Sequence, residues 1–176
     1  MLLQSVPSGK TISDVFLQQP NKFMPLLSFA QEILREPGFL DPKDREFIAA
    51  FTSSLNSCKF CTGSHKAFAI SIGADEKELE DAIGGNYEEN KLKTILDYVK
   101  VLTIAPSSLN STHVEAVLNA GFSEDQLKEA IVVCAAFNMF NRLVEGHGVE
   151  ENSDTWTESA EMINKFGYDR RGIAKH

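Results

Sequence analysis

The chain has 176 residues, which suits one domain with a sizeable core. Hydrophobic residues make up 43% and charged residues 24%, both near the globular average, so disorder of the bulk of the chain is not expected. The formal net charge of −8 disfavours binding to the phosphate backbone of nucleic acids.

Membrane and secretory signals are absent from the sequence pattern. No run approaches the roughly 18 consecutive apolar residues that a membrane helix needs. Residues 1–10 show no basic stretch followed by an apolar one, so we expect no secretory signal. These features predict one cytoplasmic domain over residues 1–176, with no nucleic-acid or membrane partner.

Helical periodicity, interrupted by Pro, Gly and capping residues, divides the chain into blocks. Asp41-Pro42 and Ser123-x-x-Gln126 are typical helix N-termini, and Gly73 and Gly84-Gly85 are typical ends. No run of strict alternation predicts a sheet, so we expect an all-α helical bundle. The predicted helices run over about 23–34, 42–55, 58–72, 75–83, 92–102, 112–119, 123–145 and 153–166.

A weak internal repeat aligns Gly73–Ile83 with Gly121–Ile131, with five of eleven positions identical. One interpretation is that both segments follow the same local rule of a glycine stop, a cap and an amphipathic helix. The other is a duplicated helical hairpin. Either way, Cys58 and Cys61 align with Pro106 and Leu109, so only the first copy carries thiols.

The segment from Asn56 to His65 carries most of the chemical information. Asn56 or Ser57 can cap a helix, which would put Cys58 in its first turn, where free amides and the helix dipole favour a thiolate. Spacings of three and four residues place Cys58, Cys61 and His65 on one helix face. In a reducing compartment, a Cys-x-x-Cys pair indicates metal binding or redox catalysis.

A histidine that acts as a base usually needs an orienting acceptor. Glu46, twelve residues before Cys58 on the preceding predicted helix, is a candidate, although it could also be an ordinary solvated residue. The same four side chains, Glu46, Cys58, Cys61 and His65, also form a legitimate zinc set. The thiols could alternatively be small core residues, which is our interpretation of Cys134 in its apolar run.

Glu46, eleven intervening residues and Cys58-x-x-Cys61-x-x-x-His65 resemble the signature of the AhpD-like alkylhydroperoxidase family, in the carboxymuconolactone decarboxylase superfamily. The lead-in from Asp41 resembles the family's preceding helix. Phe137–Val149 resembles the closing segment of its peroxidase-related branch. The resemblance is strongest over residues 20–150 and implies an all-helical AhpD-like fold that forms homo-oligomers.

The resemblance also implies a reaction that reduces hydroperoxides. Cys61 would attack the peroxide and become a sulfenic acid, Cys58 would condense with it to a disulfide, and Glu46 and His65 would relay protons. A dithiol donor, such as a lipoylated or thioredoxin-like protein, would then restore the thiols. No metal or other cofactor is expected.

One position departs from the family pattern, because Phe60 stands where characterised members carry a histidine before the second cysteine. This favours an alternative function as a thiol–disulfide oxidoreductase or redox-sensing module with little peroxidase activity. A decarboxylase acting on a lactone, as in the superfamily's other branch, is disfavoured by the cysteine pair. A zinc-stabilised protein without catalysis is a further alternative.

Overall fold

The computed structural model describes Leu3 and residues 12–169, which form helices and turns without a β-strand. Short 3-10 turns at Pro106–Ser108 and Ser153–Thr155 precede the seventh and ninth α-helices. The predicted all-α class is therefore confirmed. The α-helices are α1 (Ile12–Leu17), α2 (Pro20–Leu34), α3 (Pro42–Leu55), α4 (Lys59–Ser71), α5 (Glu76–Ile83), α6 (Lys93–Ile104), α7 (Ser111–Asn119), α8 (Glu124–His147) and α9 (Trp156–Phe166).

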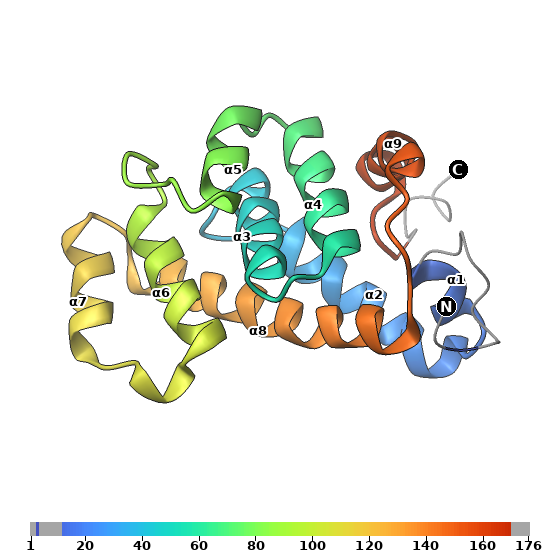
Figure 1. Cartoon of the computed structure of the whole chain (residues 1–176), viewed down its shortest axis with the longest axis horizontal. Coiled ribbons are helices and arrows are strands. Elements are labelled where there is room, and N and C mark those ends of the chain that lie inside the picture. Colours follow the sequence, from blue (N-terminus) through green and yellow to red (C-terminus); the bar gives the residue numbers. More distant parts are fainter. Residues whose placement is uncertain (1–2, 4–11, 170–176) are drawn as a thin grey trace.

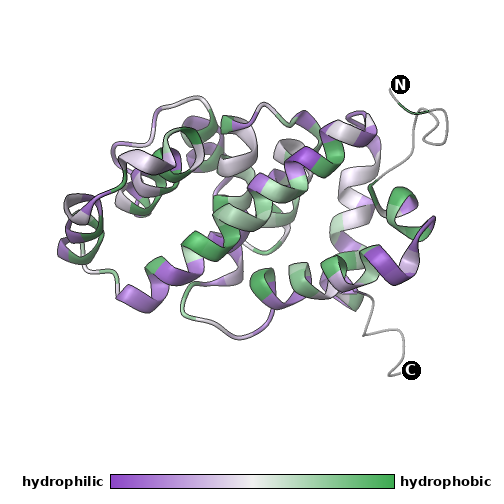
Figure 2. Cartoon of the chain, turned by 90° about the horizontal axis from the view of Figure 1, so that it is seen from below, coloured by the Kyte–Doolittle hydropathy of each residue, from purple (hydrophilic) through white to green (hydrophobic). Residues whose placement is uncertain are grey.

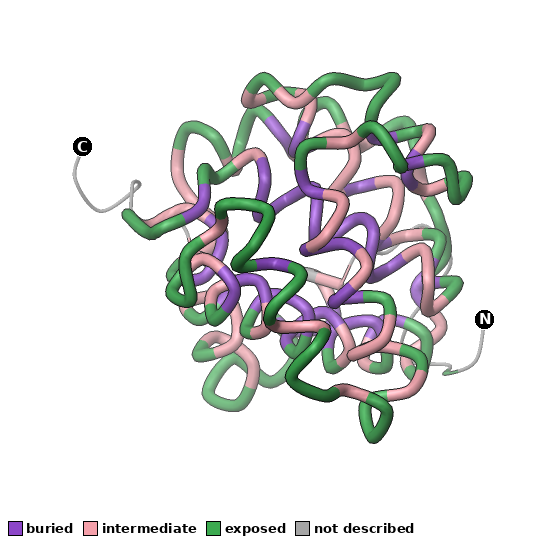
Figure 3. Tube along the Cα trace, turned by 90° about the vertical axis from the view of Figure 1, so that its left-hand side faces the viewer, coloured by how far each residue is buried: buried purple, intermediate pink, exposed green. Residues whose placement is uncertain are grey.

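Helix α3 is the centre of the packing. It packs most extensively against α4 and also contacts α2, α5, α6 and α8. The long helix α8 runs beneath this group, while α9 lies against α4 (Figure 1). Every residue from Asp44 to Ser53 is buried. In the burial view, the buried segments gather inside a shell of exposed ones (Figure 3). A central helix that buries Arg45 and Glu46 must supply them with partners.

Most helix boundaries follow the predicted signals. Asp41 and Pro42 begin α3, and Ser123 and Gln126 form a reciprocal capping box at α8. Asp75 caps α5 by accepting from the backbone N–H of Glu78 at 2.9 Å. These signals act within a few residues, which is why sequence alone locates them.

Some boundaries differ from the prediction. Helix α2 begins at Pro20, three residues before its predicted start. Cys58 is the N-cap residue of α4 and lies just outside its first turn, because the left-handed turn at Ser57 ends one residue later than expected. The last helix begins at Trp156, since Ser153–Thr155 adopts a 3-10 turn. The short helix α1 had no periodic signal, as its six residues span under two turns.

The internal repeat has a local structural counterpart. Gly73 and Gly121 both have positive φ angles, 97° and 94°, and each is followed by a capped helix. Glycine adopts this conformation without the steric cost that a Cβ would bring. The shared local rule is therefore present in both copies, and the duplicated hairpin stays a prediction.

The helices are amphipathic, and polar and apolar residues alternate along them (Figure 2). Within residues 12–169, no helix is both long enough and apolar enough to cross a membrane.

Helix α9 approaches α4 closely at Gly63. A Cβ at Gly63 would lie 1.8 Å from Cη2 of Trp156, the chain's single tryptophan. Gly63→Ala should therefore displace α9 and lower the free energy of unfolding by about 1–3 kcal/mol. Chemical denaturation followed by Trp156 fluorescence measures both effects. The matched control is Gly146→Ala in α8, where an added Cβ meets open space and should stabilise by about 0.5–1 kcal/mol. Equal stabilisation by both substitutions would contradict the close packing.

Candidate active site

The two cysteines sit at the start of α4, directly after the turn that leaves α3. Ser57 has a φ of 58°, and no other described non-glycine residue has a positive φ. The Cys58 backbone N–H donates to the Ser53 carbonyl at 3.0 Å, which closes the turn. Cys58 is the N-cap residue and Cys61 the third helical residue, two positions whose side chains meet across the first turn. Both are free thiols and both are buried.

Two asparagines of α8 form hydrogen bonds with the turn between α3 and α4. The Asn56 side-chain amide donates to Oδ1 of Asn141 at 2.9 Å and to Oδ1 of Asn138 at 3.2 Å. Asn141, itself buried, donates to Oγ of Ser53 at 2.9 Å. The cysteine-bearing turn is therefore held on α8 by polar contacts more than 80 residues away in sequence. Asn138 and Asn141 were not predicted as site residues, although they lie within the Phe137–Val149 segment that resembles the family's closing segment.

The environment of Cys58 keeps that thiol protonated. Its interaction with the Cys61 side chain, then burial, then the negative charge that Cys61 can carry raise the pKa of Cys58 far above its ordinary value. Cys61 lines a small cavity beside His65, and Cys58 does not line that cavity. The two thiols therefore differ: Cys58 is held in its protonated form, and Cys61 faces a cavity.

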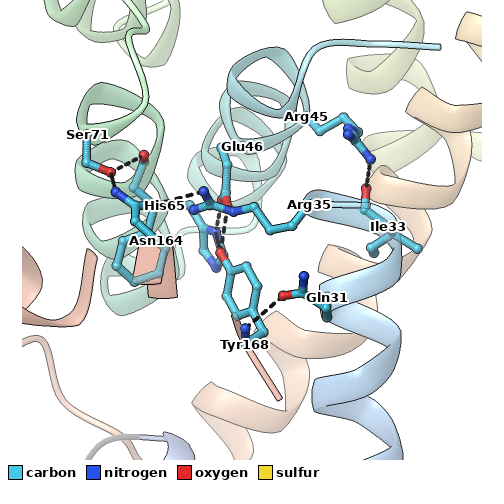
Figure 4. A network of polar contacts seen from close by, with 10 residues as sticks. Gln31, Ile33, Arg35, Arg45, Glu46, His65, Ser71, Asn164 and Tyr168 are labelled. Atoms are coloured by element: carbon cyan, nitrogen blue, oxygen red, sulfur yellow. Dashed lines mark hydrogen bonds and ion pairs between the residues drawn. The ribbon is translucent and has the colours of Figure 1, made fainter. Parts of the chain in front are cut away.

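The predicted contact between Glu46 and His65 is present. Nδ1 of His65 lies 2.7 Å from Oε2 of Glu46, and the Glu46 side chain is fully buried (Figure 4). Because a carboxylate only accepts, Nδ1 carries the proton and Nε2 is left free to act as a base. The imidazole is further fixed edge-on against Phe137, with ring centroids 4.4 Å apart. Glu46 is therefore not a solvated surface residue.

The second oxygen of Glu46 is bound by two residues that the sequence analysis missed. Oε1 accepts from Nε of Arg35 at 3.0 Å and from the Tyr168 hydroxyl at 2.7 Å. Burial, the largest influence, raises the pKa of Glu46, but the hydrogen bond and charge of His65, then Arg35 and Tyr168, outweigh it and lower this pKa below its ordinary value. Burial and the Glu46 charge raise the pKa of Tyr168, so its hydroxyl remains a donor.

Two adjoining cavities lead to the thiol. A small cavity of about 70 Å³ is lined by Cys61, His65 and mostly apolar side chains, among them Phe137 and Phe140. A neighbouring cavity of about 360 Å³ lies between α4 and α9. Five residues line both: Ile12, Leu27, Phe60, His65 and Tyr168. Phe60, the departure from the family pattern, thus lies on the approach to Cys61.

The side chains of Glu46, Cys58, Cys61 and His65 are not arranged as a zinc site. Residues 12–169 contain no group of three or more His, Cys, Asp or Glu side chains arranged to hold a metal ion. Nδ1 of His65 is already engaged by Glu46. Cys134 lies in the core, as its apolar surroundings predicted.

An all-helical fold that presents a Cys-x-x-Cys pair beside a Glu–His contact defines the class of this protein. A model of the carboxymuconolactone decarboxylase family matches residues 25–88, which include all four predicted site residues. Over these residues the chain is similar to that family.

Solved structures support this fold. A peroxidase-related protein from Silicibacter sp. TM1040 superposes with a TM-score of 0.73 at 20% identity, and 81% of this chain and 76% of that chain are covered. An alkylhydroperoxidase AhpD core protein from Ralstonia eutropha JMP134 gives a TM-score of 0.72 at 22% identity with the same coverage. At these identities the likeness concerns the fold.

Curated relatives at the sequence level are longer proteins. Sestrin-2 of Homo sapiens is 26% identical over 125 residues, covering 69% of this chain and 25% of that protein. Sestrin-2 of Bos taurus is 26% identical over 125 residues, with 69% and 26% covered. The chain therefore spans about a quarter of the length of these relatives.

The buried Glu46 carboxylate makes stability depend on pH. Its lowered pKa means that the charged form stabilises the fold above the ordinary value of 4.5, and this contribution is lost as the pH falls through the lower folded-state value. Glu46→Gln should lower the free energy of unfolding by on the order of 3 kcal/mol at pH 7, because Arg35 loses its counter-charge.

Urea unfolding at a series of pH values tests this dependence. The difference between Glu46→Gln and the wild type should narrow below pH 4.5. The control is Glu80→Gln, which removes an exposed carboxylate paired with Lys66 and should change little at any pH. If the difference in the free energy of unfolding between Glu46→Gln and the wild type stayed constant with pH, the Glu46 charge would not be the stabilising group.

Proposed function

We propose that the protein is a thiol-dependent peroxidase that reduces hydroperoxides through Cys61 and Cys58, with Glu46 and His65 as the proton relay. The observation that carries this proposal is the asymmetry of the pair. Cys61 lines a cavity beside His65, whereas Cys58 lines neither cavity and is held as a thiol. Such a cycle needs one thiol that a peroxide can reach and a second thiol beside it that condenses with the oxidised first.

In the first step, His65 takes the proton of Cys61, and the thiolate attacks the hydroperoxide. A sulfur–oxygen bond forms, the oxygen–oxygen bond breaks, and Cys61 becomes a sulfenic acid. The alkoxide that leaves takes the proton back from His65 and departs as an alcohol. Glu46 stabilises the imidazolium in between, because it faces Nδ1 at 2.7 Å.

In the second step, Cys58 gives up its proton and its sulfur attacks the sulfenic sulfur of Cys61. A disulfide forms, the sulfur–oxygen bond breaks, and the hydroxyl takes up that proton and leaves as water. A dithiol donor then exchanges with this disulfide, becomes oxidised itself and restores both thiols. We propose a lipoylated or thioredoxin-like protein as that donor. The expected cytoplasmic location and homo-oligomeric state stay predictions.

Single cysteine substitutions test the proposed roles of Cys61 as the nucleophile and Cys58 as the thiol that forms the disulfide with it. Cys61→Ser should abolish peroxide consumption with dihydrolipoamide as the dithiol, because no nucleophile remains. Cys58→Ser should still react once and accumulate a sulfenic acid that dimedone traps, as read by mass spectrometry. Cys134→Ser, which removes the core thiol, is the matched control and should retain turnover. Undiminished turnover in Cys61→Ser would rule out the proposed nucleophile.

Phe60 supports a second candidate function, disulfide exchange with dithiols and only slow peroxide reduction. Its apolar ring lines the approach to Cys61, where an ionisable side chain would assist proton transfer. An apolar neighbour also makes a thiolate more costly.

Substitution at this position separates the two candidates. Phe60→His should raise peroxide turnover roughly tenfold or more if proton transfer limits a peroxidase cycle. Phe60→Leu is the apolar control and should leave the rate near that of the wild type. Peroxide consumption and the rate of reduction by dihydrolipoamide are measured for all three proteins. Fast exchange without any gain in peroxide turnover from Phe60→His would favour the oxidoreductase.

A further inference from the structure

The segment after α9 reaches the site although it lies far outside residues 25–88, which match the family model. Gly167 has a φ of 81°, and a Cβ there would lie 2.7 Å from Oε1 of Gln31, so only glycine fits this turn readily. The next backbone N–H, of Tyr168, donates to the same Gln31 oxygen at 2.9 Å. These contacts direct the Tyr168 side chain inward.

The end of α9 is tethered as well. Asn164 accepts from Nη1 of Arg35 at 2.9 Å and donates to Oγ of Ser71 at 3.0 Å (Figure 4). The same Arg35 donates to Glu46. The segment is therefore joined to α2 and α4 on either side of the buried carboxylate, and its position is coupled to that of Glu46.

Tyr168 contacts both members of the relay. Its hydroxyl donates to Oε1 of Glu46 at 2.7 Å, and its ring lies nearly parallel to the His65 ring, with an interplanar angle of 16° and centroids 6.2 Å apart. The guanidinium of Arg35 lies over the Tyr168 ring, 5.6 Å from its centroid. Tyr168 also lines both cavities at the thiol.

We propose that Tyr168 is a positioning residue of the active site, which orients the Glu46 carboxylate toward His65 and closes one wall of the cavity at Cys61. This inference rests on the proposed relay of protons through Glu46 and His65. Arg35 and Tyr168 together occupy Oε1, which leaves Oε2 to bind Nδ1 of His65. Without the hydroxyl, Oε1 keeps Arg35 as its donor but loses one of the two contacts that fix the plane of the carboxylate.

The groups around Glu46 determine in which direction its pKa moves when the Tyr168 hydroxyl is removed. Two cationic or ionisable groups bind Glu46 directly: Arg35 at the end of α2 and His65 from α4. Arg45 on α3 is near enough to feel the Glu46 charge, and it pairs with Glu129 from α8. Tyr168 contributes a donor from the last segment. A carboxylate that loses a hydrogen-bond donor binds protons more readily and holds an imidazolium more strongly. Removing the hydroxyl therefore raises the pKa of Glu46, and the more basic carboxylate favours a protonated His65 beside it.

Tyr168→Phe tests the inference because it keeps the ring and removes only the hydroxyl. The matched control is Tyr87→Phe, which removes a tyrosine hydroxyl that faces a different carboxylate, that of Asp97. Proton NMR titration follows His65, one of four histidines, whose signal is assigned with His65→Asn. The pH profile of peroxide turnover with dihydrolipoamide is measured alongside.

In Tyr168→Phe, we expect the titration midpoint of the His65 signal and the acid limb of the turnover profile to move up by roughly half to one pH unit. We expect kcat/KM at neutral pH to fall about 3- to 10-fold. The control should show neither change. Unchanged titration and pH profile in Tyr168→Phe would overturn the inference, whether or not the variant is less stable. A shifted titration in a protein that consumes no peroxide would instead uphold the positioning role and refute the proposed peroxidase function.

Discussion

The carboxylate of Glu46 is the constraint on which the site depends. It is a fully buried charge on α3, the helix that contacts α2, α4, α5, α6 and α8. Such a group is tolerated only when donors replace the water it has lost. Those donors come from three separate elements: Arg35 at the end of α2, His65 on α4 and Tyr168 after α9. The requirement to satisfy one charge thus specifies how three distant segments meet.

This arrangement links stability to chemistry. The hydrogen bond that helps to stabilise Glu46 also fixes the tautomer of His65, because Nδ1 must keep its proton while it faces a carboxylate. The free Nε2 is then available on the helix that carries Cys61, one turn away along α4. Buried polar groups in a core are costly, so a protein that served only as a scaffold would gain by replacing this set with apolar side chains. Their presence is itself an argument for a functional site.

The sequence predicted those features that depend on near neighbours and missed those that depend on distant ones. Proline, glycine and capping residues located α3 to α8 to within a few residues, and the Glu46–His65 contact followed from helix spacing and the need for an acceptor. The partners of the other Glu46 oxygen could not be deduced in this way. Tyr168 is 122 residues from Glu46, and a single tyrosine after a glycine carries no periodic signal. The position of Cys58 was wrong by one residue because the left-handed conformation of Ser57 is unusual for a residue other than glycine.

The position of Cys58 has a chemical consequence. As the N-cap residue, it lies in extended backbone conformation, with φ −80° and ψ 93°, while Cys61 is already within the helix. The backbone of Cys58 is nevertheless fixed at both ends, because its N–H donates to the Ser53 carbonyl at 3.0 Å and its carbonyl accepts from the backbone N–H of Thr62 at 2.9 Å. A disulfide between the two residues is therefore reached by rotation of the cysteine side chains, while the backbone of α4 keeps Cys61 in register with His65. The asymmetry of the pair lies in protonation and in access to the cavity.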